Sequence, residues 1–194
     1  PYDALIQRYD PGLKSEEIDI IFLQVKDWLP RLTSQICEKQ KNTKSIRIKK
    51  DLDTKKQKKL CTEIIKLLGF NFNKGRLDES IHPFCGGVKE DIRITTRFSK
   101  NTFLHSLFAA IHETGHARYE QNLPSTLHNQ PVSKARSMSI HESQSLFFEK
   151  QIGCNPNFIK RILPIIKRYL NYDPEFNEFD FLALINTVEP SYIR

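Results

Sequence analysis

The stretch His112-Glu113-Thr114-Gly115-His116 decides the fold, because it places two imidazoles four residues apart with a carboxylate beside the first. On a helix, side chains at positions i and i+4 lie on one face, so both histidines can reach a single ion. Glu113 lies about 100° around the same turn, near the ion without pointing at it. The arrangement predicts zinc-assisted hydrolysis, with two ligands and a general base for a zinc-bound water.

The residues before this motif favour a helix with an apolar face. The segment 103–111 contains no proline, and its large apolar residues recur at helical spacing: Leu104, Leu107, Phe108 and Ile111. Gly115 is a poor helix residue, costing about 1 kcal/mol relative to alanine. Its presence suggests that another part of the chain approaches the backbone closely there. The competing interpretation is two histidines on a half-buried helix face, hydrogen-bonded and without a metal, and this context argues against it.

A catalytic zinc needs a third protein ligand and an open position for water or substrate. In one large class the third ligand is a later histidine, in HExxHxxGxxH. Tyr119 and Asn122 stand where that pattern requires glycine and histidine, so this class is excluded. The other solution is a glutamate from a second helix.

The segment 137–149 supplies such a glutamate, and its serines can cap the helix. Glu142 lies 26 residues after His116, which leaves room for the first helix to end, a proline-containing loop to turn and a second helix to return. We therefore predict Glu142 as the third ligand. Glu120 and Glu149 are rival carboxylates, more typical of hydrogen-bond partners around a metal site.

Several further motifs stand in order around the HETGH helix. HETGHARYEQ is followed by SIHESQS, and upstream lie His82-Pro83-Phe84 and the segment 91–98, DIRITTRF. These motifs resemble the carboxypeptidase Taq (M32) family of zinc metallocarboxypeptidases, and the likeness extends to residues 1–5 and 188–194. The resemblance implies His112, His116 and Glu142 as metal ligands and Glu113 as the catalytic base.

The resemblance also implies the reaction and its partners. It predicts hydrolysis of C-terminal peptide bonds of peptides with a free C-terminus, Zn²⁺ as the cofactor with Co²⁺ as a substitute, and a homodimer. Five residues are weaker candidates for substrate binding: His82, Arg93, Arg97, His141 and Arg194. His141, next to a predicted ligand, is a candidate for a hydrogen bond to the oxyanion or to the ligands, and is at least equally consistent with structural packing. An exposed strand face would hold both Arg93 and Arg97 equally well.

The chain as a whole is expected to be mainly α, with a helical metallopeptidase core and a small antiparallel β-sheet beside the active site. The core consists of the HExxH helix and the second ligand helix. Alternation at residues 92–97 predicts strand structure. Further helices are expected at 15–40, at 54–68 with Gly69 as its stop, at 157–170 broken by Pro164, and at 179–187. Residues 1–194 are interpreted as a single domain, the incomplete central and catalytic part of an M32-like enzyme.

Composition leaves two alternatives to a working peptidase. The first is a catalytically impaired fragment that retains metal binding only. The second is nucleic-acid binding through residues 39–59, which carry ten Lys/Arg and two Asp and so account for the net charge of +7. No aromatic interleaving accompanies them, and no nucleic-acid partner is expected. The four cysteines form no CxxC pair and no apolar run could cross a bilayer, so we expect no membrane partner and a cytoplasmic setting.

Overall fold

The computed structural model describes residues 2–43, 46, 51–127, 130–171 and 175–190. The chain divides into two compact units, Pro1–Arg47 with Ala183–Arg194, and Ile48–Leu182. The HETGH motif belongs to the second unit. The single domain expected over residues 1–194 stays a prediction.

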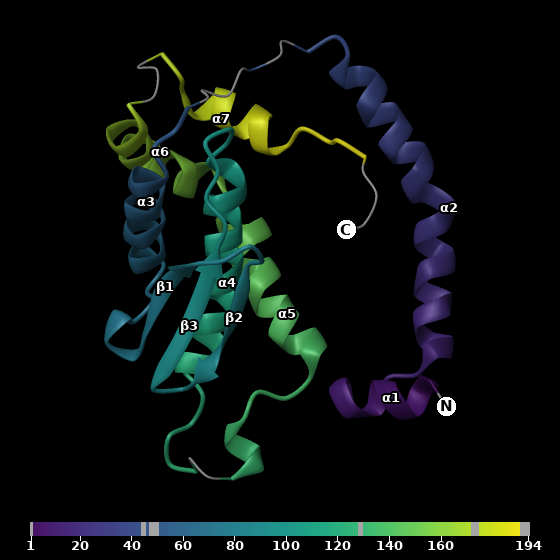
Figure 1. Cartoon of the computed structure of the whole chain (residues 1–194). Helices are drawn as coiled ribbons and strands as arrows, with labels where there is room; N and C mark the ends of the chain where they lie inside the picture. The colour runs from purple at the N-terminus through teal and green to yellow at the C-terminus, as the bar shows by residue number, and fades with distance from the viewer. Residues whose placement is uncertain (1, 44–45, 47–50, 128–129, 172–174, 191–194) are drawn as a thin grey trace. The chain divides into compact units, whose positions relative to one another are not determined.

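In the first unit, α1 (Tyr2–Tyr9) is followed by α2 (Ser15–Gln40), the helix predicted for this stretch (Figure 1). The Asp3 carboxylate accepts a hydrogen bond from the backbone N–H of Ser15 at 2.9 Å, which ties the two helices together. The Gln40 amide donates to the carbonyl of Val188 and accepts from its N–H, at 2.9 and 2.7 Å. These two bonds fasten the end of α2 to the last described segment.

The second unit contains a three-stranded sheet of β1 (Gly75–Glu79), β2 (Phe84–Val88) and β3 (Asp91–Thr96), in the order β1-β3-β2. β2 and β3 pair antiparallel, as predicted, whereas β1 pairs with β3 in parallel. The sheet is therefore mixed, and the prediction of a wholly antiparallel sheet was wrong for β1. Between β1 and β2 the chain crosses from one edge of the sheet to the other. β3 then takes the central position, antiparallel to β2 and so parallel to β1.

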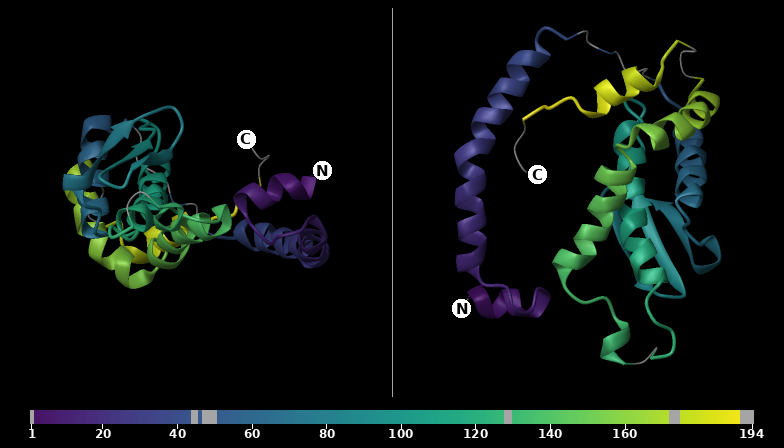
Figure 2. Two further views of the ribbon diagram at one scale, coloured as in Figure 1. Left: turned by 90° about the horizontal axis from the view of Figure 1, so that it is seen from below. Right: turned by 180° about the vertical axis from the view of Figure 1, so that it is seen from behind.

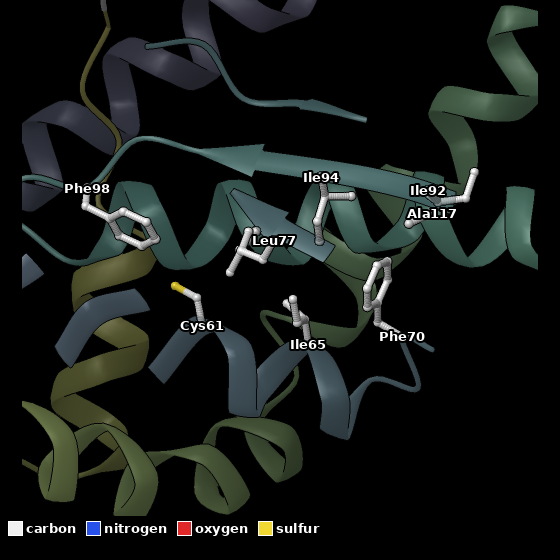
Figure 3. Packing of buried hydrophobic residues seen from close by; sticks show 9 residues of the cluster. Cys61, Ile65, Phe70, Leu77, Ile92, Ile94, Phe98 and Ala117 are labelled. Atoms are coloured by element: carbon white, nitrogen blue, oxygen red, sulfur yellow. The ribbon is translucent and has the colours of Figure 1, made fainter. Parts of the chain in front are cut away.

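The sheet packs on α3 (Thr54–Leu67) and α4 (Leu104–Gln121), and this contact forms a hydrophobic core (Figure 3). Alternate residues of β3 point inward, so Ile92 and Ile94 are buried while Arg93 is exposed. Buried residues of α3, α4, β1 and β3, and of the segments next to them, meet in one cluster: Cys61, Ile65, Phe70, Leu77, Ile92, Ile94, Phe98, Ala110 and Ala117. The core holds α4 against the sheet, and α4 carries the HETGH motif.

A predicted helix stop at Gly69 and a predicted helix break at Pro164 can be compared with the structure. α3 ends at Leu67, and Gly69 follows with φ +89, a left-handed conformation that favours glycine, as expected of a helix stop. α6 (Pro156–Leu170) runs on through Pro164, so the predicted break was wrong. Pro164 lies on the exposed side, where water can bond to the carbonyl that loses its partner, while buried isoleucines and leucines hold the other side.

The helix that was predicted to supply the third ligand, Glu142, is α5 (Met138–Leu146). It continues as a π-helical turn, η3 (Phe147–Ile152). It runs alongside α4 on the side away from the sheet (Figure 2). Ser137 caps it, because its hydroxyl accepts the backbone N–H of Ile140 at 3.2 Å. The remaining elements are η1 (Phe72–Lys74), η2 (Pro131–Ser133) and α7 (Glu178–Ile185). Within the described ranges, no helix has the length and apolar character that a bilayer crossing requires.

Candidate metal centre

One face of α4 presents a ladder of three polar side chains, one per turn: His112, His116 and Glu120. Spacing of four residues places them above one another along the helix. The opposite side of α4 carries Ala110 and Ala117, which are fully buried in the core with the sheet. The apolar face therefore fixes the helix and directs the ladder toward α5.

The neighbouring helix supplies a second ladder that runs in the opposite direction. Glu142 and Glu149 are seven residues apart, close to two helical turns, so both can face α4. His141 meets Glu120 and His116, Glu142 meets both histidines of the motif, and Glu149 meets His112. As numbers rise along α5 they fall along α4, so the two helices are antiparallel.

The ligand atoms of His112, His116 and Glu142 all lie within 4.8 Å of one another. His112 Nε2 is 3.6 Å from Glu142 Oε1, and His116 Nε2 is 3.3 Å from Glu142 Oε2. Ligands at zinc distances in a tetrahedral arrangement stand about 3.3 Å apart. Two imidazoles and one carboxylate are also a donor set that zinc accepts, so the residues fit a divalent metal.

Each histidine of the pair has a hydrogen-bond partner on its other ring nitrogen. His112 Nδ1 lies 2.8 Å from Glu149 Oε2, and His116 Nδ1 lies 2.6 Å from His141 Nδ1. His141 Nε2 in turn lies 2.8 Å from Glu120 Oε1. The rivals Glu120 and Glu149 thus behave as partners of histidines, as their positions suggested, and both Nε2 atoms remain directed at Glu142.

Glu113 is buried, with 7% of its surface exposed. Burial raises the pKa of its carboxyl to about 7, the charge of Glu142 adds to this rise, and His112 opposes it. Both His112 and Glu142 therefore lie close enough to Glu113 for their charges to influence its pKa. A carboxylate with a pKa near neutrality can both accept and release a proton, as a general base must.

The two histidines differ in their affinity for a proton. The hydrogen bond that Glu149 accepts raises the pKa of His112, and burial opposes the rise. Burial, together with the neighbouring rings of His141 and His112, lowers the pKa of His116 to about 4. Burial also works to raise the pKa of Glu149, but bonds from His112 and Lys150 outweigh it and the pKa falls. His116 is therefore kept neutral, the form in which imidazole binds a metal.

The backbones of α4 and α5 approach each other closely at Gly115. A Cβ there would lie 2.5 Å from the carbonyl oxygen of Gln144 and 2.5 Å from the Cα of Ser145. Such distances are too short for a real side chain, so only glycine allows this approach. The expectation that another part of the chain comes close at Gly115 is confirmed, and that part is the helix that carries Glu142.

A family comparison extends this local picture to the whole chain. The model of the carboxypeptidase Taq (M32) metallopeptidase family matches residues 1–194. The chain belongs to the M32 family. The resemblance that its motifs suggested is thereby confirmed.

Named relatives of this M32 chain agree with the match. Carboxypeptidase 1 of Bacillus subtilis is 38% identical to it, over 100% of the chain and 39% of the relative. Thermostable carboxypeptidase 1 of Thermus thermophilus is 33% identical, over 100% and 38%. A solved structure, metallocarboxypeptidase 1 of Trypanosoma cruzi, superposes with a TM-score of 0.93 at 42% identity, over 98% of this chain and 40% of that one. The chain spans about two fifths of the length of these relatives.

The five weaker candidates for substrate binding in this M32 chain differ in where they lie. Arg93 is on the exposed face of the sheet, where its guanidinium binds the Asp91 carboxylate at 2.6 Å. Arg97 and His82 are exposed, and the carbonyl of His82 accepts a hydrogen bond from Thr95. Arg194 falls outside the described residues. Of the four that the structure describes, only His141 is hydrogen-bonded to a residue of the metal group, as the partner of His116.

Glu113→Gln is expected to stabilise the metal-free protein at pH 8 by about 1–3 kcal/mol, because it removes a buried charge. The folded-state pKa of about 7 lies above the ordinary pKa of 4.5 for this carboxyl, so the stability contributed by the protonated form is complete below pH 4.5 and lost as pH rises through 7. The gain should therefore shrink to less than about 1 kcal/mol at pH 5. Urea unfolding of chelator-treated protein at both pH values measures it.

The matched control for this experiment is Glu79→Gln, which neutralises an exposed carboxylate on β1. It should change the free energy of unfolding little at either pH. Equal stability of wild type and Glu113→Gln at pH 8 would show that Glu113 carries no buried charge.

Proposed function

We propose that this protein is a metal-dependent carboxypeptidase that releases residues from the C-terminus of peptides. The observation that carries the proposal is the convergence of His112, His116 and Glu142 from two antiparallel helices, beside the buried Glu113. Family membership adds the polarity of cleavage, because the relatives are named carboxypeptidases. The chemistry of HExxH by itself does not distinguish the two ends of a peptide.

The three ligands would hold Zn²⁺, with Co²⁺ as a substitute of similar coordination. The bound metal would supply Lewis acidity, which makes a water more acidic and polarises the scissile carbonyl. Glu113 takes the proton from the attacking water and delivers it to the leaving amine. Glu149 and His141 hold the two histidines with Nε2 toward Glu142.

The substrate is proposed to lie along β2, the strand that pairs antiparallel with β3. β2 is an edge strand of the described sheet, and it packs on α4. Burial raises the pKa of Cys85 on this strand to about 12, and the charges of Glu113 and Glu120 add to the rise, so β2 lies near both carboxylates. An extended peptide that pairs with the open edge of β2 would bring its backbone to the metal group.

A panel of three peptides tests the polarity of cleavage. The chain is loaded with one equivalent of Zn²⁺ and incubated with one peptide sequence in three forms: free at both ends, N-acetylated, and C-terminally amidated. Mass spectrometry should find stepwise loss of C-terminal residues from the first two forms and none from the third. Release of N-terminal residues, or cleavage inside the amidated peptide, would contradict the proposal.

A second candidate function is metal binding without turnover. The observation that favours it is the grouping of His112, His116 and Glu142, which accounts for metal binding by itself and carries no evidence of turnover. In the same experiment, one bound equivalent of zinc with no release from any peptide would support this alternative. Supplying the remaining segments of a relative in trans would then show whether turnover depends on them.

A further inference from the structure

Glu120 and His141 form a hydrogen-bonded pair on the side of His116 that faces away from Glu142. Glu120 Oε1 lies 2.8 Å from His141 Nε2, and His141 Nδ1 lies 2.6 Å from His116 Nδ1. The three side chains are partly buried, with 27%, 19% and 14% of their surfaces exposed. Hydrogen bonds shielded in this way are stronger than the same bonds in water.

The pair determines which nitrogen of His116 carries a proton. An ionised carboxylate only accepts hydrogen bonds, so His141 must carry its proton on Nε2 to bond to Glu120. With its one proton on Nε2, the His141 ring accepts at Nδ1, and His116 must donate from its own Nδ1. This leaves a lone pair on His116 Nε2, the atom that lies 3.3 Å from Glu142 Oε2.

The other arrangements of protons would block the site. If His141 carried a proton on Nδ1, it would donate to His116 Nδ1, and His116 would hold its own proton on Nε2. A protonated Nε2 has no lone pair for a metal. The contact between His141 and Glu120 therefore selects the tautomer of His116 that can bind a metal through Nε2. Glu120 acts on His116 through His141.

Packing fixes the plane of the His141 ring. The ring stands edge-on to Tyr119, with centroids 5.3 Å apart, and lies 4.6 Å from the ring of His116. Its own backbone N–H bonds to the carbonyl of Ser137 at 3.1 Å, in the first turn of α5. The backbone bond holds the start of the His141 side chain in place, and the ring contacts with Tyr119 and His116 restrict how far the ring can turn.

We propose that Glu120 and His141 are a positioning pair that sets the tautomer and the orientation of His116 for metal binding. The inference rests on the proposed metal site. It extends that proposal by assigning roles to two side chains outside the three proposed ligands. Both residues act through His116. The pair is the counterpart, on His116, of the single carboxylate Glu149 on His112.

The tautomers can be measured in the wild-type protein. Long-range ¹H–¹⁵N correlation spectra of the zinc-loaded chain should show His141 protonated on Nε2 and His116 protonated on Nδ1. Spectra of the metal-free chain should show the same tautomer of His141, because Glu120 sets it. His141 protonated on Nδ1 in the zinc-loaded protein would overturn the proposal.

Metal affinity gives an independent measurement. Competition with a chromogenic chelator should give a Zn²⁺ affinity about 10–100-fold lower for His141→Ala and for Glu120→Ala. Glu120→Gln should lose less, because its amide oxygen can still accept from His141 Nε2. The absorption spectrum of the Co²⁺-loaded alanine variants should also change, since it reports ligand geometry.

Controls separate positioning from general damage and from the proposed function. His105→Ala removes an exposed histidine of α4 and should keep wild-type affinity, and thermal unfolding of each metal-free variant checks its fold. Wild-type affinity and an unchanged Co²⁺ spectrum in folded His141→Ala would overturn the inference. A chain that shows the predicted losses but cleaves no peptide would contradict the proposed peptidase and leave the positioning pair intact.

Discussion

Glu113→Gln is expected to slow release of C-terminal residues by about 1000-fold while zinc stoichiometry stays at one per chain. The substitution keeps the size and the burial of the side chain, which is 7% exposed, but removes the group that accepts a proton. Because Glu113 is not among the three grouped ligands, metal binding should persist. The loss should appear in kcat with little change in KM, since the proton moves only during the reaction.

This result is measured by mass spectrometry of a peptide with a free C-terminus, on zinc-loaded wild type and variant in parallel. Glu79→Gln, which neutralises an exposed carboxylate on β1, should keep wild-type kcat. Undiminished release by Glu113→Gln would remove Glu113 from the mechanism. Loss of zinc from the variant would instead assign Glu113 to the metal shell.

Gly115→Ala is expected to lower zinc affinity by at least about 100-fold, although alanine is the better helix former by about 1 kcal/mol. The added Cβ would meet backbone atoms of Gln144 and Ser145 at 2.5 Å, and backbone cannot give way without moving α5. Glu142 stands on α5, so it would move away from both histidines. Overpacking of this kind also destabilises a fold by about 1–3 kcal/mol.

Gly86→Ala is the matched control for this substitution. A Cβ at Gly86 would meet the far end of the Phe84 ring, a side chain that is 64% exposed and free to shift. Chelator competition and urea unfolding should therefore find wild-type values for Gly86→Ala. Wild-type zinc affinity in Gly115→Ala would show that the close approach of the two helices does not position Glu142.

The sequence sufficed to predict much of the centre because its information is local. The spacing of His112 and His116 places both on one face of one helix, whatever the rest of the chain does. Gly115 indicated a close approach by the cost of glycine in a helix. The end of α3 followed equally from a local signal, because Gly69 stands just past its last turn.

What sequence alone did not determine depends on contacts between distant segments. Glu120, Glu142 and Glu149 all stand at helical positions that could face the ligands, and only the antiparallel register of α5 against α4 separates their partners. The direction of β1 depends on which edge of the sheet the chain crosses to. The continuity of α6 through Pro164 depends on which side of that helix is buried.

The antiparallel pairing of α4 and α5 has a mechanical consequence. Glu142 follows His116 by 26 residues, and an ion held by both would close that loop in the manner of a disulfide. Its binding energy would then count toward folding, by about 2.7 kcal/mol when free zinc is 100-fold above its dissociation constant. The ion would thus serve as a removable cross-link, and a chelator would loosen the loop between the two helices while leaving the sheet and its core in place.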